Sequence, residues 1–204
     1  MKKIGLILFV ALFILASYTW AHPHVFIEGK ASFIFNKDGL ESINVEWMFD
    51  EMFSTMILTD YDANKDKKFS ANEVKKIKDE AFSNLKDYKY FTFIRINKKP
   101  FKVKYVTDFN VSMSGKNMIY HFSVPCHVKA NANNKELILA YHDESYYIDL
   151  YLSENNPVSF QNNEEFVTKF KIKENDDYSP GENTILPQEL IMKFKKKSEN
   201  HEKL

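Results

Sequence analysis

The sequence predicts an α+β fold in which an antiparallel, β-rich domain carries an inserted helix-loop-helix. The chain contains 18 Phe and 11 Tyr, and many of them alternate with polar residues, as half-buried strands require. The alternation stops between about residues 51 and 87, where apolar residues recur at helical spacing. A chain of 204 residues is long enough for one domain with a sizeable core and small appendages.

The first 21 residues have the features of a secretory signal peptide. Lys2 and Lys3 precede an apolar run of about a dozen residues, and Ala21 ends a stretch of small and polar residues. The alternative is an uncleaved membrane anchor, but the run is shorter than the roughly 20 apolar residues of a spanning helix. We therefore expect cleavage after Ala21, secretion, and no stable membrane insertion afterwards.

The remaining elements follow in chain order. Residues 24–49 alternate on both sides of Asp38-Gly39, which predicts a hairpin with a two-residue turn. Helices are expected over 50–61 and 71–85, on either side of a polar loop. The later strands are expected at "FTFIRI", "FKVKYV", "FNVSM", "MIYHFSVPCHV", "ELILAYH", "YYIDLYL" and "FVTKFKI". The domain thus covers residues 22–174, and residues 175–204 read as a linker, a weak apolar segment and a charged tail.

Composition excludes several classes of function. The chain has 28 basic and 28 acidic residues, a balance that argues against nucleic acid as a partner. Cys126 is the single cysteine, so no intramolecular disulfide can form. The sequence has no glycine-rich phosphate loop, no Gly-x-Ser-x-Gly elbow and no His-Glu-x-x-His pair. We therefore expect that the protein is not an enzyme.

The polar loop "DANKDKKFSANE" has the spacing of an EF-hand. Calcium takes six to eight oxygens, which a twelve-residue loop supplies from places 1, 3, 5, 7, 9 and 12. Place 6, normally Gly, is Lys67, which predicts weak binding. The alternative is an acidic turn in which Ser70 and Glu73 only cap the second helix. The expected calcium ligands are Asp62, Asn64, Asp66, the carbonyl of Lys68, Ser70 through water, and Glu73.

A second metal site is expected at the mature terminus. After cleavage, His22 offers an amine and an imidazole that chelate one ion together, and His24 offers another imidazole. Pro23 has no amide proton, which excludes a copper or nickel clip built from deprotonated amides. Imidazole suits nickel, cobalt, zinc and copper alike.

Carboxylates near this end of the hairpin are candidates to complete the site. A two-residue turn at Asp38-Gly39 would put Asp50 opposite Ile27 and Glu51 opposite Phe26. The alternative is that this acidic pair caps the first helix. Another candidate pair, His142 and Asp143, follows an apolar strand.

Several segments together resemble an uncharacterised bacterial periplasmic family. They are "HPHVFIEG", "WMFDEMFS", the EF-hand-like loop, "YKYFTFI" and "YHDESYYIDL". Members of that family are described as periplasmic components of an ABC-type transport system and often accompany nickel/cobalt permeases. The resemblance implies a periplasmic location, an inner-membrane metal permease as partner, and a link to transition-metal transport.

Three hypotheses of function remain open. The first is a periplasmic accessory protein that binds a divalent metal (nickel, cobalt, zinc or copper) for a permease. Its ligands would be His22 and His24, completed from Asp50, Glu51, His142 and Asp143. The second is a copper carrier with an N-terminal histidine brace, and the third is a secreted interaction domain stabilised by calcium.

Overall fold

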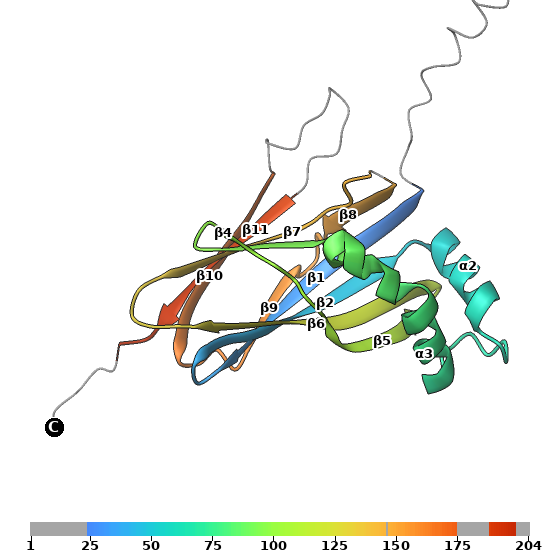
Figure 1. The fold of residues 1–204 in the computed structure, drawn as a ribbon, viewed down its shortest axis with the longest axis horizontal. Helices are drawn as coiled ribbons and strands as arrows, with labels where there is room; N and C mark the ends of the chain where they lie inside the picture. Colours follow the sequence, from blue (N-terminus) through green and yellow to red (C-terminus); the bar gives the residue numbers. More distant parts are fainter. Residues whose placement is uncertain (1–23, 146, 175–187, 199–204) are drawn as a thin grey trace, which may run out of the picture.

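The computed structural model describes residues 24–145, 147–174 and 188–198 (Figure 1). Its helical elements are α2 (Glu51–Tyr61), α3 (Ala71–Glu80) and the 3-10 helix η1 (Phe82–Phe91). Its strands are β1 (Val25–Asn36), β2 (Gly39–Phe49), β3 (Thr92–Ile96), β4 (Lys99–Phe101), β5 (Thr107–Ser114), β6 (Asn117–Lys129), β7 (Lys135–Tyr141), β8 (Ile148–Leu152), β9 (Val158–Gln161), β10 (Phe166–Glu174) and β11 (Gln188–Lys196).

The strands form two sheets. Sheet A has the order β5-β6-β2-β1-β8, with β9 also paired to β1, and sheet B has the order β10-β11-β7-β3-β4. Pairing is antiparallel except that β1 runs parallel to both β8 and β9. The α+β class and the mostly antiparallel pairing are therefore confirmed. The parallel pairs were not predicted, because they join segments more than a hundred residues apart.

The first hairpin forms with a different register from the predicted one. Its turn is Lys37 and Asp38, and Gly39 already opens β2, paired with Asn36. Gly39 has φ +148°, and a Cβ there would lie 2.2 Å from the Val128 carbonyl oxygen, so only glycine fits. With a bulge between Ile34 and Phe35, the register pairs Ile27 with Phe49.

Two further segments also differ from expectation. The sequence "FKVKYV" is a strand only at Phe101, because the chain after β4 leaves sheet B and crosses to β5 in sheet A. The segment expected to lie outside the domain contains β11, which is inserted between β10 and β7. The domain thus extends to at least Lys196. The predicted linker at 175–187 and the last six residues of the tail lie outside the described residues.

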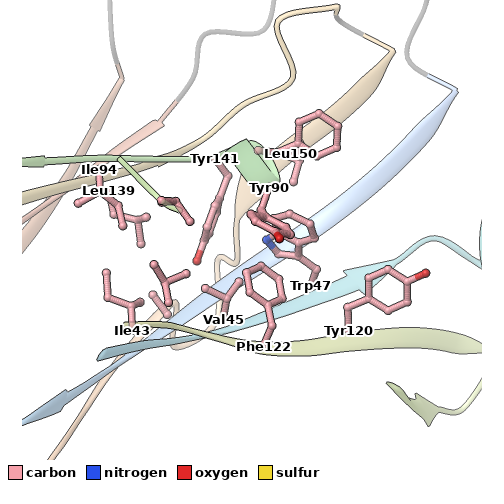
Figure 2. Packing of buried hydrophobic residues seen from close by; sticks show 14 of the residues in the cluster. Ile43, Val45, Trp47, Tyr90, Ile94, Tyr120, Phe122, Leu139, Tyr141 and Leu150 are labelled. Atoms are coloured by element: carbon pink, nitrogen blue, oxygen red, sulfur yellow. The ribbon is translucent and has the colours of Figure 1, made fainter. Parts of the chain in front are cut away.

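The inner faces of the sheets share one hydrophobic core. Trp47 of β2 meets the ring of Tyr141 of β7 edge-on, with centroids 6.0 Å apart. Phe35 of β1 meets Phe194 of β11 in the same way at 5.4 Å. Figure 2 shows Tyr141 and Leu139 on one side of this core, facing Val45 and Phe122 on the other. The alternating aromatic residues thus serve as the core between two layers, as their period required.

The helical region sits at one end of the molecule, beside β5 and β6 (Figure 1). Ser54 of α2 is fully buried, and its hydroxyl accepts the Met118 N–H of β6 at 2.8 Å. The second helix ends at Glu80 instead of about residue 85. The 3-10 turn that follows places Phe82 against Phe109 of β5, the edge strand of sheet A, with ring centroids 4.0 Å apart.

Candidate functional site

The loop between α2 and α3 has a closed geometry organised around its first residue. One carboxylate oxygen of Asp62 accepts the Asp66 N–H at 3.2 Å, and the other accepts the Lys67 N–H at 2.8 Å. Lys67, at place 6 of the loop, has φ +62°, and Lys65, at place 4, has φ +60°. These are the left-handed conformations for which glycine is usually selected. The backbone therefore turns sharply at place 6 although the residue there is lysine.

The other end of the loop is fixed by Glu73. Its carboxylate accepts the Ala63 N–H and both the N–H and the hydroxyl of Ser70, each at 2.8 Å. The hydrogen bonds from Ser70 are the main reason that the pKa of Glu73 is lowered. Ser70 is also the N-cap of α3, so the predicted capping box is present. Both Asp62 and Glu73 are buried, and their carboxylates accept backbone N–H groups of the loop itself.

The remaining expected calcium ligands lie between these two residues. Asn64 donates its side-chain N–H to Asp66 at 3.0 Å, and the other oxygen of Asp66 accepts the Lys68 N–H at 2.8 Å. Across the described ranges, no group of three or more His, Cys, Asp or Glu side chains is arranged to hold a metal ion. The loop carboxylates are instead engaged by backbone N–H groups and by neighbouring side chains.

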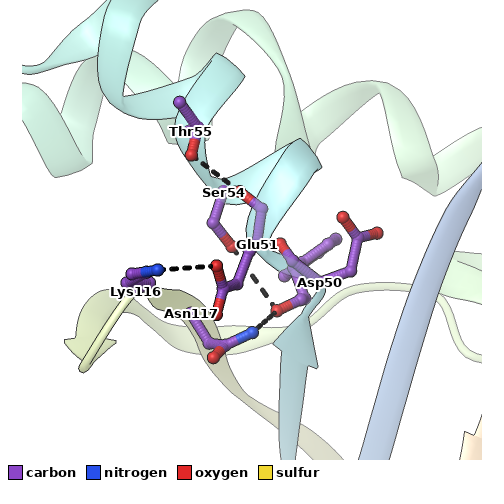
Figure 3. A network of polar contacts seen from close by, with 7 residues as sticks. Asp50, Glu51, Ser54, Thr55, Lys116 and Asn117 are labelled. Carbon is purple, nitrogen blue, oxygen red and sulfur yellow. Dashed lines mark hydrogen bonds and ion pairs between the residues drawn. The ribbon is translucent and has the colours of Figure 1, made fainter.

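Asp50 and Glu51 occupy the start of α2, where they act as structural groups. Asp50 is the N-cap: its carboxylate accepts the Phe53 N–H at 2.9 Å and, through its other oxygen, the Phe26 N–H of β1 at 2.9 Å. Glu51 points to Lys116, 3.2 Å away, on the opposite side of the helix start (Figure 3). Asp50 thus lies opposite Phe26, one place from the predicted partner Ile27, because the turn lies at Lys37 and Asp38 and the bulge opposite Ile34 and Phe35 offsets only half of that change.

Of the two expected N-terminal ligands, His22 and His24, the structure describes only His24. His22 lies outside the described residues. His24 is exposed at the start of β1, where its N–H donates to the Tyr147 carbonyl at 2.9 Å. The His24 and Tyr147 rings lie 5.0 Å apart. The entry of the chain into sheet A is therefore held against the turn that precedes β8.

His142 and Asp143 point into different environments although they are neighbours. Asp143 accepts the Ser145 N–H and hydroxyl and the Ile148 N–H, at distances between 2.7 and 3.0 Å, and so closes the turn before β8. His142 lies near Phe93 of sheet B, with ring centroids 6.1 Å apart. Burial lowers the pKa of His142, against the opposing effect of Asp143 and Glu144.

The structure therefore brings only some of the predicted transition-metal ligands together. His24 and Asp143 belong to the same corner of sheet A, since Val25 pairs with Ile148, which donates to Asp143. Glu51 and His142 are engaged elsewhere.

Sequence reasoning missed Asp149 near this corner. Asp149 pairs with Phe26 in the parallel register, and burial raises its pKa. Burial is the main reason that the pKa of Tyr151 is raised. Nearby carboxylates raise it further: Glu28, Asp149, Glu154 and Asp50. A carboxylate inside the apolar segment "YYIDLYL" was the available signal. The outer face of β1 and β8 is thus acidic close to His24.

The sequence matches a known protein family. A family model described as a protein of unknown function, DUF1007, matches residues 7–201. The chain belongs to the DUF1007 family. It is 30% identical over 105 residues, 52% of this chain and 74% of the relative, to an uncharacterised 15.5 kDa protein encoded in the trpE 3' region of Spirochaeta aurantia. It is 24% identical over 143 residues, 69% of this chain and 67% of the relative, to an uncharacterised protein of Haemophilus influenzae.

The names of these two relatives state no activity. Among the described residues, no helix is long and apolar enough to cross a membrane. The expected signal peptide lies outside that part of the chain.

Proposed function

We propose that this DUF1007 protein is a divalent-metal-binding accessory protein of the bacterial periplasm, and that its 62–73 loop holds calcium. One observation supports the calcium site above all: a lysine at place 6 is held at φ +62° while Asp62 accepts the N–H groups of places 5 and 6. This conformation costs a non-glycine residue on the order of 1 kcal/mol, a cost that a bound cation would offset.

Calcium would replace the internal partners of the loop carboxylates. Asp62, Asn64 and Asp66 would each supply a side-chain oxygen, and Glu73 would supply two. The Lys68 carbonyl and a water held by Ser70 would complete the shell. Lys65, Lys67 and Lys68 oppose a cation by charge, so the dissociation constant should fall in the range of about 0.1 to 1 mM that extracellular modules show. The role of such an ion is structural.

Thermal unfolding with and without calcium tests this site. At a dissociation constant of about 0.5 mM, 5 mM calcium stabilises the folded state by about 1.4 kcal/mol. Glu73→Gln retains an oxygen to accept the capping bonds but loses the charge and the bidentate carboxylate, so its Tm should not respond to calcium. Glu80→Gln, at the exposed end of α3, is the matched control and should respond like the parent. A parent Tm unchanged by 5 mM calcium, or a response retained by Glu73→Gln, would refute the site.

A transition-metal task is the second proposal, and it rests on the corner at His24. His24 is exposed there. Two carboxylates lie beside Phe26, two residues further along: the Phe26 N–H donates to Asp50, and Phe26 pairs with Asp149 of β8. A cluster of negative charge raises the local concentration of cations. The amine and imidazole of His22 with the imidazole of His24 would bind first, and a carboxylate would follow.

The family resemblance supports the same task. It implies that the protein works beside an inner-membrane nickel/cobalt-type permease, to which it would deliver or from which it would accept the ion. Nickel and cobalt are the ions expected on this ground. A copper carrier with a histidine brace uses the same amine and imidazoles, and copper leads the affinity order for such ligands.

Metal titration of the secreted protein distinguishes these alternatives. Mass spectrometry first establishes the mature terminus, and nickel, cobalt, zinc and copper are then titrated with calcium present. His22→Ala and His24→Ala should each weaken metal binding at least tenfold. The control is His127→Ala, which should not weaken it; His127 is an exposed histidine of β6 that forms an ion pair with Glu41 of β2. One residue added before His22 should have the same effect as His22→Ala. Unchanged affinity in these variants would exclude both transition-metal proposals and leave the calcium-stabilised interaction domain.

A further inference from the structure

Sheet B has a cavity on the face that points away from the shared core. The cavity has a volume of about 410 Å³, and its walls include Phe93, Ile138 and Ala140. These residues alternate along β3 and β7 with Ile94 and Leu139, which belong to the core. The chain at 100–103, where it leaves sheet B, forms the opposite wall. The cavity is therefore separate from both the calcium loop and the His24 corner.

The walls of this cavity are mainly apolar. Phe93, Phe101, Val103, Ile138 and Ala140 present hydrocarbon to its interior. Water in such a space gains few hydrogen bonds, so an apolar group displaces it favourably. At roughly 30 Å³ for each water-sized group, the space takes on the order of a dozen non-hydrogen atoms.

The charges around the cavity are mostly positive. Arg95 forms an ion pair with Glu189, the one carboxylate of the lining, and Lys173 also approaches Glu189 to 3.5 Å. The negative charge of Glu189 is therefore already matched. Lys102 lines the cavity, and no carboxylate in the described part of the chain lies within ion-pair distance of it.

Two further polar groups of the lining do not reverse this balance. Lys89 holds its ammonium 4.8 Å from the centre of the Phe93 ring and 3.2 Å from Glu144, where both lysine and glutamate are largely exposed. His142 is buried in the lining and adds no carboxylate to it. An excess of positive charge thus borders an apolar chamber.

We propose that this cavity binds a small carboxylate with an apolar body, of the medium-chain fatty acid kind. Lys102 attracts the carboxylate at the rim, and the hydrocarbon fills the space between Phe93, Ile138 and Phe101. Charge complementarity and size both select this class: an uncharged hydrocarbon gains nothing from the rim, and a cation is repelled by it. The site is independent of metal binding.

Decanoate, which has twelve non-hydrogen atoms, is the probe, and decanol is its uncharged counterpart. Isothermal titration of the purified protein should show saturable decanoate binding below about 1 mM. Decanol should bind at least fivefold more weakly. Lys102→Glu should weaken decanoate binding about tenfold and leave decanol unchanged. The matched control is Lys37→Glu, which makes the same charge change in the exposed turn between β1 and β2 and should bind like the parent.

Filling the cavity provides a second test that does not depend on charge. Ala140→Phe and Ile138→Trp each add bulk on the outer face of β7, away from the core, and each should abolish decanoate binding. Circular dichroism and Tm establish that each variant is folded, and either folded variant suffices. Parent-like binding in a folded filling variant would place decanoate elsewhere and overturn the proposal. Equal affinity for decanoate and decanol, or no decanoate binding at all, would overturn it as well.

Discussion

Gly29→Ala is predicted to destabilise the protein because the two sheets approach each other closely at this residue. A Cβ on Gly29 would lie 2.8 Å from both Cδ2 and Cε2 of the Tyr141 ring. Tyr141 cannot move away easily, since it is 2% exposed and its hydroxyl donates to the Lys30 carbonyl at 3.1 Å. The Trp47 ring also abuts it, with the centroids 6.0 Å apart. The added methyl group must therefore displace a ring that is held on several sides.

The size of the effect follows from two opposing contributions. Overpacking of a well-packed core costs about 1 to 3 kcal/mol. Alanine is better than glycine in a strand by about 0.5 to 1 kcal/mol, which offsets part of this cost. At the midpoints of these ranges the net loss should be about 1 kcal/mol in the free energy of unfolding, equivalent to a fall in Tm of roughly 2 to 4 °C for a domain of this size. Urea unfolding followed by circular dichroism measures it.

A double-mutant cycle tests the cause. Tyr141→Leu removes the ring that the new methyl group would meet, so Gly29→Ala should cost little or nothing in that background. A Gly29→Ala variant as stable as the parent would refute the argument. So would an equal cost of Gly29→Ala with tyrosine and with leucine at 141, because the loss would then have another origin.

Three further predictions concern single residues. Lys67→Gly should raise calcium affinity several-fold in a titration, since glycine adopts φ +62° without the penalty of about 1 kcal/mol, whereas Lys68→Gly should not. Burial lowers the pKa of His142 in the folded state, so the unfolded state takes up its proton first as pH falls below the ordinary value of 6.5. The free energy of unfolding should therefore fall as the pH is lowered through that range. A pH series of Tm values should show a smaller fall for His142→Gln than for the parent, and an equal fall would contradict this. Burial raises the pKa of Cys126 to about 12, so iodoacetamide should leave the thiol unmodified at pH 8 until the protein is unfolded, as mass spectrometry can determine.

The sequence predicted correctly those elements that depend on residues close together in the chain. The start of α3 was predicted because Ser70 and Glu73 make the capping box within four residues. The strand β6 was predicted because its apolar residues recur at every second position, and β7 because it is a short, continuous apolar run. The end of α3 was not, because residues 81–85 retain a helical pattern, and only the packing of Phe82 against Phe109 decides in favour of a 3-10 turn.

The candidate site divides in the same way. The proposed calcium ligands could be grouped from the sequence, because they share one twelve-residue loop. The proposed transition-metal ligands come from distant segments, so whether they lie close together depends on strand register. The turn at Lys37 and Asp38, offset in part by the bulge opposite Ile34 and Phe35, moved Asp50 by one place. The parallel pairing of β1 with β8 introduced Asp149 instead of His142. No pattern within either segment records such pairings.

The sequence by itself determined the α+β class, the position of the helix-loop-helix, and the alternation that fills the core. These depend on the backbone period and on contacts between residues close in the chain. The tertiary structure alone decided that the described strands form two sheets, that β11 lies between β10 and β7, and that a cavity opens on the outer face of sheet B. The physical reason is that hydrogen bonds between strands do not depend on side-chain identity, so the choice of partner follows from how all the apolar faces are buried together.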